Sequence, residues 1–417
     1  MAQATSRRLF AAVMVGAVLA IGGCSGREVD ARPGVLVAAL PGAPAHLNPA
    51  ITTNGGVHAA ADLLYDGLLA LDDQQRPMPR LATHWEVLDD GARYIFHLRQ
   101  GVRWHDGEPF TAADVVFSFN DILLRFHSRT RASLGPVVDS IVAPNDSTVV
   151  FHLSQPYAPL MQQLDVVEAP ILPRHIYAGT DPQTNPANSS PVGTGPFRFV
   201  ESRAGAELRY AANDEYFGGA PGISRLILRV IPDPGTQVIA LEAGEVDWLY
   251  GVPGAERARL LATPHIKFIE TALNAGGSNC LTTVAFNLDR RVFSDVRMRR
   301  ALTLAVDRQQ FVDRVLFGQG SAATAPIASA LLLARPSGVM LPPHDPAWAA
   351  ALLDSLGWHR TGDAMRVARN VAGVPDGTPL QVGFKQLASF AAYGDLLRAQ
   401  WRAVGVDLRI ETLETAV

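Results

Sequence analysis

Few side chains of this chain stand at the spacings that catalysis or metal binding requires. His84 and the adjacent pair His105-Asp106 have no further ligand at the helical spacing of a zinc site, so we interpret them as turn and surface residues. The chain contains no His-Glu-x-x-His motif, no Gly-x-Ser-x-Gly elbow and no Walker loop. We therefore predict no catalytic residue, no metal site and no enzymatic activity.

Glycines and cysteines suggest no cofactor site either. Gly318-Gln-Gly320 lacks the third glycine of a dinucleotide loop and follows a predicted helix, so we predict no cofactor. The chain has two cysteines, Cys24 and Cys280, which cannot form a zinc motif. Cys280 is either a free thiol, half of a disulfide with a cysteine outside this sequence, or a small buried hydrophobic residue.

Composition indicates an α/β protein of two lobes without a nucleic-acid partner. The 417 residues are 48% hydrophobic, enough for two separate cores. The net charge is -4, the only lysines are Lys267 and Lys385, and there is no basic run of the kind that binds nucleic acid. Strands and helices alternate along the chain without an internal repeat, which favours a mixed α/β class.

The N-terminus predicts export. Arg7-Arg8 precede an apolar run from Leu9 to Ile21, which is shorter than the roughly 20 residues that span a bilayer. Gly22-Gly23 then lead into Cys24, so residues 1–23 read as a signal peptide. The ending resembles a bacterial lipobox with Cys24 as the lipidated residue, and the alternative is an ordinary signal peptide. We expect a lipid-anchored protein of the periplasm or cell envelope, exported by the general or the twin-arginine route.

A compact unit is predicted between Tyr65 and Asn120. Asp90-Gly91 separate two runs of strand-forming residues, which indicates a hairpin with a primed two-residue turn. Thr111 and Asp114 are spaced as a capping box at the start of an apolar helix.

The segment before this unit could present backbone groups to a ligand. The run 35–40 predicts a buried strand, a polar loop follows, and a helix begins near Val57 and includes Leu68 and Leu69. A strand, a Gly-rich loop and a helix in this order often place backbone N–H groups against a ligand, although the loop could equally be a plain connection. Further along, we predict a boundary in the loop 180–191, a strand at 282–287 and three helices capped by Ser294, Asp307 and Asp345.

Several stretches together resemble one known family, the bacterial extracellular solute-binding proteins of family 5, which serve ABC importers of dipeptides, oligopeptides and nickel. They are Tyr65–Asn120 (with YDGLL, WHDG and FTA-x-DVVFS), Gly193–Phe199 (GTGPFRF), Pro232–Trp248, Phe286–Gly320, Asp345–Trp358 and Leu397–Ile410. They occur in family order and cover nearly all of the chain after the signal peptide.

The resemblance implies a periplasmic-binding-protein flytrap of two lobes. Residues 24–60 and 190–278 would form a discontinuous lobe I, 61–189 an inserted subdomain of lobe I, and 279–417 lobe II. The segment Glu270–Asn287 would cross between the lobes at the hinge. Family members normally continue beyond the strand equivalent to 406–410, so we expect lobe II to be incomplete at its C-terminus.

The family likeness also implies a mechanism and candidate residues. A peptide would be captured by lobe closure and delivered to a membrane permease and its ATPase by a monomeric binding protein. Thr53, Asn54 and Gly55 match the ligand-facing loop after the first strand. Asn279 and Cys280 lie on the crossing segment, and Lys385 and Gln386 fall where a relative binds a carboxylate. The alternatives are a nickel chelate, heme or opine as ligand, or a ligand sensor outside transport.

Overall fold

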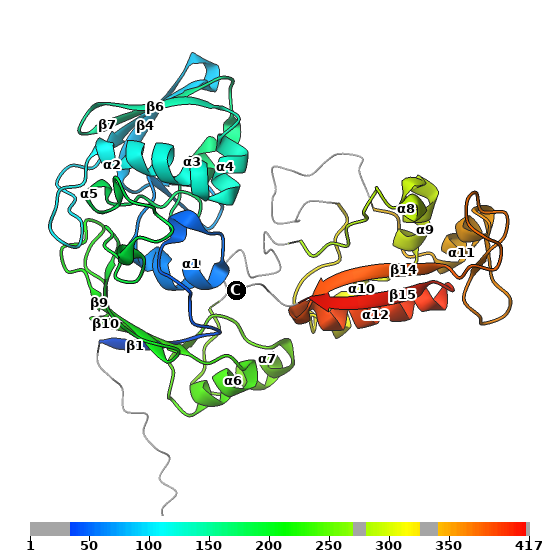
Figure 1. The fold of residues 1–417 in the computed structure, drawn as a ribbon. Helices are drawn as coiled ribbons and strands as arrows, with labels where there is room; N and C mark the ends of the chain where they lie inside the picture. Colours follow the sequence, from blue (N-terminus) through cyan, green and yellow to red (C-terminus); the bar gives the residue numbers. More distant parts are fainter. Residues whose placement is uncertain (1–33, 270–280, 326–340, 414–417) are drawn as a thin grey trace, which may run out of the picture.

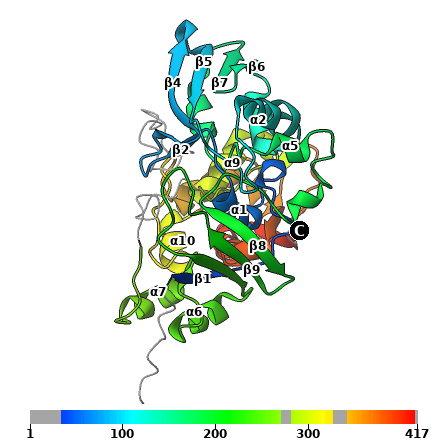
Figure 2. The same cartoon turned by 90° about the vertical axis from the view of Figure 1, so that its left-hand side faces the viewer.

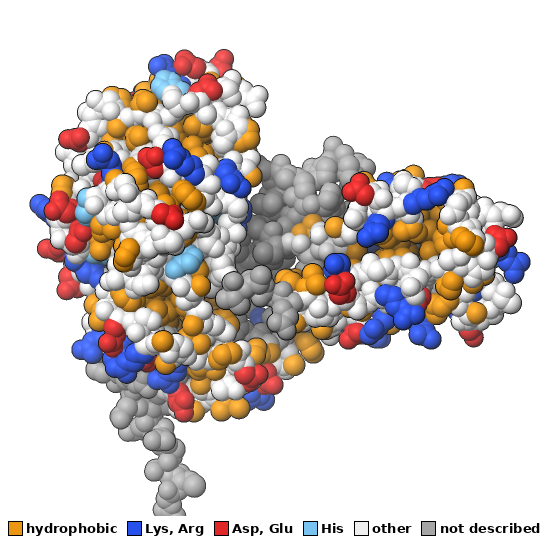
Figure 3. All heavy atoms as spheres, in the orientation of Figure 1, with side chains coloured by type: hydrophobic (Ala, Val, Ile, Leu, Met, Phe, Trp, Pro, Cys, Tyr) orange, Lys and Arg blue, Asp and Glu red, His pale blue; other side chains and the backbone are white. Residues whose placement is uncertain are grey.

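The computed structural model describes residues 34–269, 281–325 and 341–413, which fold into an N-terminal and a C-terminal α/β unit (Figure 1). The N-terminal unit contains two sheets, one of five and one of four strands. Both views place helix α1 (Gly55–Ala61) between these sheets (Figures 1 and 2). Positive and negative side chains are interspersed over the face seen in Figure 3.

The first strand of the chain lies inside the five-stranded sheet, next to the edge strand β11. Its order is β11-β1-β10-β9-β8, with β1 parallel to β10 and β11 and the remaining pairs antiparallel. The strands are β1 (Val35–Leu40), β8 (Phe197–Arg203), β9 (Glu207–Ala212), β10 (Arg225–Val230) and β11 (Trp248–Leu249), and the helices α6 (Pro234–Glu242) and α7 (Gly254–Leu261) accompany them. The carboxyl ends of β1, β10 and β11 therefore share one edge, where ligands of open α/β sheets bind.

The four-stranded sheet is antiparallel, in the order β4-β5-β7-β6. Its strands are β4 (Ala82–Leu88), β5 (Arg93–Leu98), β6 (Val138–Asn145) and β7 (Thr148–Leu153). It packs against α2 (Ala112–Phe117), which continues through a π-helical turn (Ser118–Leu123) into α3 (Leu124–Phe126), and α4 (Ser128–Leu134) follows. The unit also contains β2 (Leu69–Leu71), β3 (Pro77–Pro79) and α5 (Arg174–Tyr177).

The predicted hairpin is confirmed, but its turn is longer than expected. Strands β4 and β5 pair from Leu88↔Arg93 onward, which leaves four residues in the loop. Asp89, Asp90 and Gly91 have φ angles of 53°, 54° and 94°. Three consecutive residues in the left-handed region replace the predicted two-residue primed turn, and Asp is among the few non-glycine residues that adopt this region readily.

The predicted capping box is also confirmed. The Asp114 carboxylate accepts a hydrogen bond of 2.8 Å from the backbone N–H of Thr111, the N-cap of α2. Its other oxygen accepts from the backbone of Arg174, so the cap also ties α2 to α5.

The helix predicted to run from Val57 to Leu69 is wrong in its second half. Helix α1 ends at Ala61, a 3₁₀ turn occupies Asp62–Leu64, and Leu69 lies in β2. Gly67 lies so close to the segment after Gln163 that a Cβ there would be 2.5 Å from the carbonyl oxygen of Leu164. Tertiary pairing with that segment therefore overrides the helical spacing of the leucines.

The C-terminal unit combines small sheets with five helices within its described residues. The helices are α8 (Arg291–Ser294), α9 (Val296–Leu304), α10 (Arg308–Arg314), α11 (Pro346–Ser355) and α12 (Ala391–Ala403); the strands are β12 (Trp358–His359), β13 (Val367–Ala368), β14 (Gln381–Leu387) and β15 (Asp407–Leu413). Strands β14 and β15 are parallel.

Two local predictions for this unit are corrected. Residues 282–287 form no strand, and the cap of α9 is Asp295, whose side chain accepts from the backbone of Arg297, rather than Ser294. Asp307 and Asp345 cap α10 and α11 as predicted.

Two main hydrophobic cores correspond to the two units. One continuous cluster joins both N-terminal sheets, with members from Ala38 in β1 to Phe151 in β7. A separate cluster in the C-terminal unit includes Leu302, Leu353 and Trp401. The sheets of the N-terminal unit therefore share one interior.

A buried carboxylate lies at the junction of these sheets. Asp66 is 1% exposed and accepts hydrogen bonds from Arg80 (2.7 Å), Tyr216 (2.9 Å) and Thr194 (2.9 Å). Burial raises the pKa of Asp66, and the Arg80 charge and the two hydroxyls oppose this shift. The YDGLL and GTGPF motifs, which are far apart in the sequence, therefore meet at one side chain.

We expect Asp66→Ala to lower the free energy of unfolding by about 3 kcal/mol, because it removes the carboxylate that accepts hydrogen bonds from these three donors. The guanidinium of Arg80 is partly exposed, so water can hydrate it in the variant. The expected loss of stability therefore lies at the lower end of the range for breaking a buried ion pair. Urea unfolding measures the change. Asp121→Ala, which breaks an exposed pair with Arg125, is the control and should cost less than about 1 kcal/mol. Equal losses in the two variants would contradict the role of Asp66.

Candidate ligand-binding site

The loop between β1 and α1 is fixed by its own side chains. The Asn54 side chain caps α1, with its Oδ1 accepting from the backbone of Gly56 (2.9 Å) and Val57 (3.2 Å). The Thr52 hydroxyl accepts from the backbone of Asn54 at 3.1 Å. Asn54 and Gly55 are exposed and Thr53 is partly exposed, so the loop offers backbone and polar atoms to solvent from a defined conformation.

His58 connects this loop to the body of α1. Its Nδ1 lies 2.9 Å from the Asp62 carboxylate and its Nε2 lies 3.1 Å from the Thr52 carbonyl oxygen. Burial lowers the pKa of His58, but its contacts with Asp62 and the Thr52 carbonyl outweigh burial, and the net direction is upward. Burial raises the pKa of Asp62, against the charges of His58 and Arg129.

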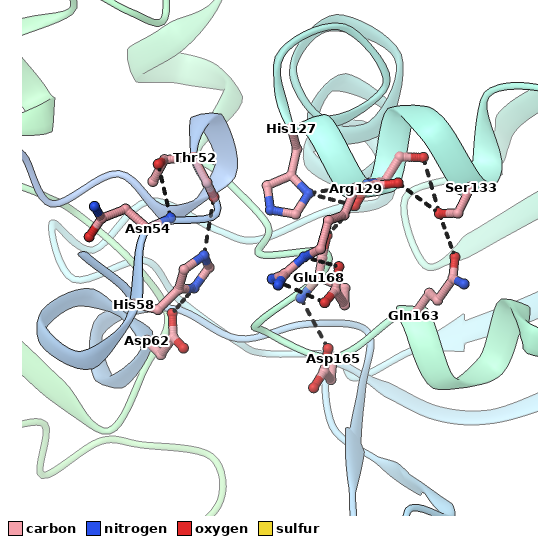
Figure 4. A network of polar contacts seen from close by, with 11 residues as sticks. Thr52, Asn54, His58, Asp62, His127, Arg129, Ser133, Gln163, Asp165 and Glu168 are labelled. Carbon is pink, nitrogen blue, oxygen red and sulfur yellow. Dashed lines mark hydrogen bonds and ion pairs between the residues drawn. The ribbon is translucent and has the colours of Figure 1, made fainter. Parts of the chain in front are cut away.

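A second polar group faces His58 from the start of α4 and from the segment after the 3₁₀ helix Ala158–Gln163 (Figure 4). Arg129 forms a two-point ion pair with Glu168, with N–O distances of 3.1 Å for both contacts. Asp165 accepts from the backbone of Glu168. Burial raises the pKa of Asp165 to about 6, so this carboxyl can change charge near neutral pH.

His127 completes the polar group. It is 0% exposed, and burial together with the nearby positive charge of Arg129 lowers its pKa to about 4. Its Nδ1 accepts from the backbone of Thr130 as the N-cap of α4, and its Nε2 is buried without a hydrogen-bond partner. The rings of His58 and His127 are 6.3 Å apart, with an edge of one directed at the other. A histidine with a lowered pKa and a histidine with a raised pKa therefore lie side by side.

A cavity of about 450 Å³ adjoins these residues. Asp62 and Asp165 line it, together with Tyr65, Asp66 and Arg80. The polar group thus extends from the loop surface toward the junction held by Asp66.

The sequence matches the family described as "Bacterial extracellular solute-binding proteins, family 5 Middle" over residues 76–417. The chain belongs to this family. The predicted resemblance is thereby confirmed, and membership in an extracellular family implies export. No helix within the described ranges is long and apolar enough to span a membrane.

Relatives of this solute-binding protein match most of its length. The dipeptide-binding protein of Escherichia coli (strain K12) is 29% identical over 404 residues, 91% of this chain and 72% of the relative. The heme-binding protein A of Haemophilus influenzae is 28% identical over 398 residues, 90% of this chain and 69% of the relative. The structure of the oligopeptide-binding protein AppA from Bacillus subtilis in complex with a nonapeptide is 25% identical, with a TM-score of 0.74 over 91% of this chain and 75% of that chain. This match confirms the mixed α/β fold.

The side chains of Lys385 and Gln386, the predicted site residues of the C-terminal unit, do not lie side by side in the structure. Lys385 and Gln386 are neighbours on β14, so their side chains point to opposite faces. Lys385 is exposed and pairs with Glu411 at 3.4 Å. Gln386 is buried against Gly394 of α12, and its Oε1 has no hydrogen-bond partner. Asn279 and Cys280 lie outside the described residues.

The interpretation of His105 as a surface residue is wrong. Its Nδ1 accepts from the backbone of Gly193 (3.2 Å) and its Nε2 donates to the carbonyl of Gly195 (3.0 Å). Burial lowers the pKa of His105 to about 4, which keeps the ring neutral for this paired role. His105 therefore connects the WHDG and GTGPF motifs. Among the described residues, no group of three or more His, Cys, Asp and Glu is placed to hold a metal ion.

Sequence reasoning missed the polar group beside the loop. His58 and Asp62 stand four residues apart in a predicted helix, and this spacing was a usable signal for their contact. His127, Arg129 and Glu168 come from other segments, and local patterns do not predict such contacts.

We expect Asn54→Ala to lower the free energy of unfolding by about 1 kcal/mol, because it removes the cap of α1. Asn54→Ser keeps a capping oxygen and should retain most of the stability while removing the side-chain amide. Thermal unfolding of the two variants compares them. Equal destabilisation by serine and alanine would show that the cap is not the source of the loss.

Proposed function

We propose that this solute-binding protein captures peptides outside the cytoplasm and delivers them to the permease and ATPase of an ABC importer. The observation that carries this proposal is the similarity to the dipeptide-binding protein of E. coli across 91% of the chain. The nonapeptide complex of AppA gives a second peptide-binding relative with the same fold. The protein would act as a monomer and without catalysis.

Capture would follow from closure of two lobes on the ligand. We propose that residues 24–60 and 190–278 make up lobe I, 61–189 its inserted subdomain and 279–417 lobe II. The separate core clusters of the N- and C-terminal units support two bodies that can move apart. A ligand that contacts both bodies shifts the population toward the closed form by its extra affinity for that form.

The loop Thr53–Gly55 would supply the contacts of lobe I. The Oδ1, the backbone N–H and the carbonyl of Asn54 are all used within the loop and α1. The contacts with the ligand would therefore come from Thr53, from the N–H of Gly55 and from the amide nitrogen of Asn54. Backbone pairing with an extended peptide tolerates many side chains. Lys385, whose amine is exposed, could bind a ligand carboxylate after leaving Glu411, whereas Gln386 would have to leave its buried position. Asn279 and Cys280 remain candidates at the crossing segment.

Export and anchoring complete the proposal. Residues 1–23 would be removed as a signal peptide, and Cys24 would carry the lipid that holds the mature protein at the membrane. The charged start, short apolar run and small residues before Cys24 support this reading.

We expect peptides in the solute released when protein purified from its native envelope is denatured and examined by mass spectrometry. A binding protein whose lobes have closed on a ligand retains that solute through purification, because the lobes must open before the ligand can leave. A defined heme, nickel chelate or opine in place of peptides would overturn the peptide assignment. Addition of the released peptides to ligand-free protein should raise its melting temperature, by mass action.

We expect the mature protein to incorporate a labelled fatty acid at Cys24. In Cys24→Ser the label should disappear and the protein should leave the membrane fraction, because the lipid is its proposed anchor. Cys280→Ser is the matched control and should keep both label and membrane association. Label that persists in Cys24→Ser would contradict the lipoprotein assignment.

A further inference from the structure

The contacts of His58 require an extra proton. The Thr52 carbonyl oxygen can only accept a hydrogen bond, and the ionised carboxylate of Asp62 can also only accept. Both lie within hydrogen-bond distance of the ring nitrogens of His58. A neutral imidazole has one N–H and can satisfy one of these partners, whereas an imidazolium satisfies both.

Some groups around His58 favour the protonated ring and others disfavour it. Asp62, on the same helix, favours the charged ring. From α4, Arg129 disfavours it, and His127 is neutral and does not repel it. From the segment after the 3₁₀ helix Ala158–Gln163, Asp165 lies close to Asp62, and its pKa of about 6 makes it neutral in acid and negative in base. Glu168 on the same segment is paired with Arg129. The balance leaves the ring charged at acidic pH and able to lose its proton as the pH rises.

The direction of the effect follows from linkage. A histidine whose pKa is raised by folding stabilises its folded contacts fully below its unfolded pKa, and this stabilisation is lost as the pH rises through the folded value. His58 has such a raised pKa. Its two hydrogen bonds are therefore complete in acid and incomplete in base.

We propose that His58 is a proton-dependent latch on the ligand-facing loop: its charged ring holds the Thr52 carbonyl and the Asp62 carboxylate together, and loss of the proton releases one contact and loosens residues 52–54. The inference rests on the proposed role of this loop in holding solute. His127 can take over the released carbonyl, because its ring lies beside His58 and interacts with the backbone of Thr52, while its buried Nε2 makes no hydrogen bond of ordinary length. The solute-binding surface is thereby coupled to external pH.

Hydrogen exchange of the full chain without added solute tests the latch. The probe is the peptide that covers residues 52–58, whose amides at Asn54, Gly56 and Val57 depend on the loop conformation. Between about pH 5 and pH 9, a range that brackets the ordinary histidine pKa, we expect its protection to fall about five-fold after correction for intrinsic rates, the effect of one hydrogen bond. His58→Gln, which cannot become charged, should show constant protection. His84→Gln, which changes an exposed histidine on β4, should behave as the unchanged protein.

A second measurement keeps the latch testable if His58→Gln fails to fold. Protein with ¹³C-labelled histidine should show one ring, assigned by its loss in His58→Asn or His58→Gln or by its contact with His127, that titrates above the ordinary histidine pKa of about 6.5. Titration of His58 at or below that value, or loop protection that does not change with pH, would overturn the proposal. Both readouts are made without solute, so a negative result would contradict the latch but not the proposed capture of peptides. Absence of released peptides would contradict peptide capture but not the latch.

Discussion

The Asp66 carboxylate lies where the two sheets of the N-terminal unit meet, and its hydrogen bonds to Arg80, Thr194 and Tyr216 fix how the sheets are joined. A buried charge is costly unless its oxygens are satisfied, so the three donor segments have to approach together. His105 adds a second connection at the same junction through the backbone of Gly193 and Gly195. Two of the six stretches that resemble the family, Tyr65–Asn120 and Gly193–Phe199, therefore meet at this junction.

The candidate site depends on the same arrangement. Helix α1 lies between the sheets and carries His58, with Asp62 as its C-cap residue, and α4 with its N-cap brings Arg129 and His127 to face them (Figure 4). Neither segment could form this polar group alone. Asp66 follows α1 and its 3₁₀ turn closely in the chain, so the junction lies next to the helix that carries the loop, while the hydrogen bonds within the loop fix the loop itself.

Local physics predicted much of the fold from sequence. The hairpin β4–β5, the capping box of Thr111 and the caps of α10 and α11 depend on residues close in the chain, and all were predicted. The end of α1 was not, because Leu69 is drawn into β2 and Gly67 lies against a distant segment. His105 was misread for the same reason, since both of its partners are about 90 residues away. In the site, the position of the loop was predictable, while its polar neighbours from α4 and beyond were not.

The hydrogen bonds already made within the loop limit which of its groups can contact a ligand. The Asn54 oxygen is committed to the helix cap, and the Thr52 carbonyl is committed to His58. Recognition by the Asn54 oxygen is thereby restricted. In the proposed site, Thr53 and the backbone N–H of Gly55 would remain for a ligand, and backbone contacts of this kind would read the main chain of an extended ligand rather than its side chains. A surface of this kind suits solutes that share a backbone and differ in side chains, as peptides do. Its selectivity then depends on how firmly the backbone is held, and the proton on His58 controls that firmness.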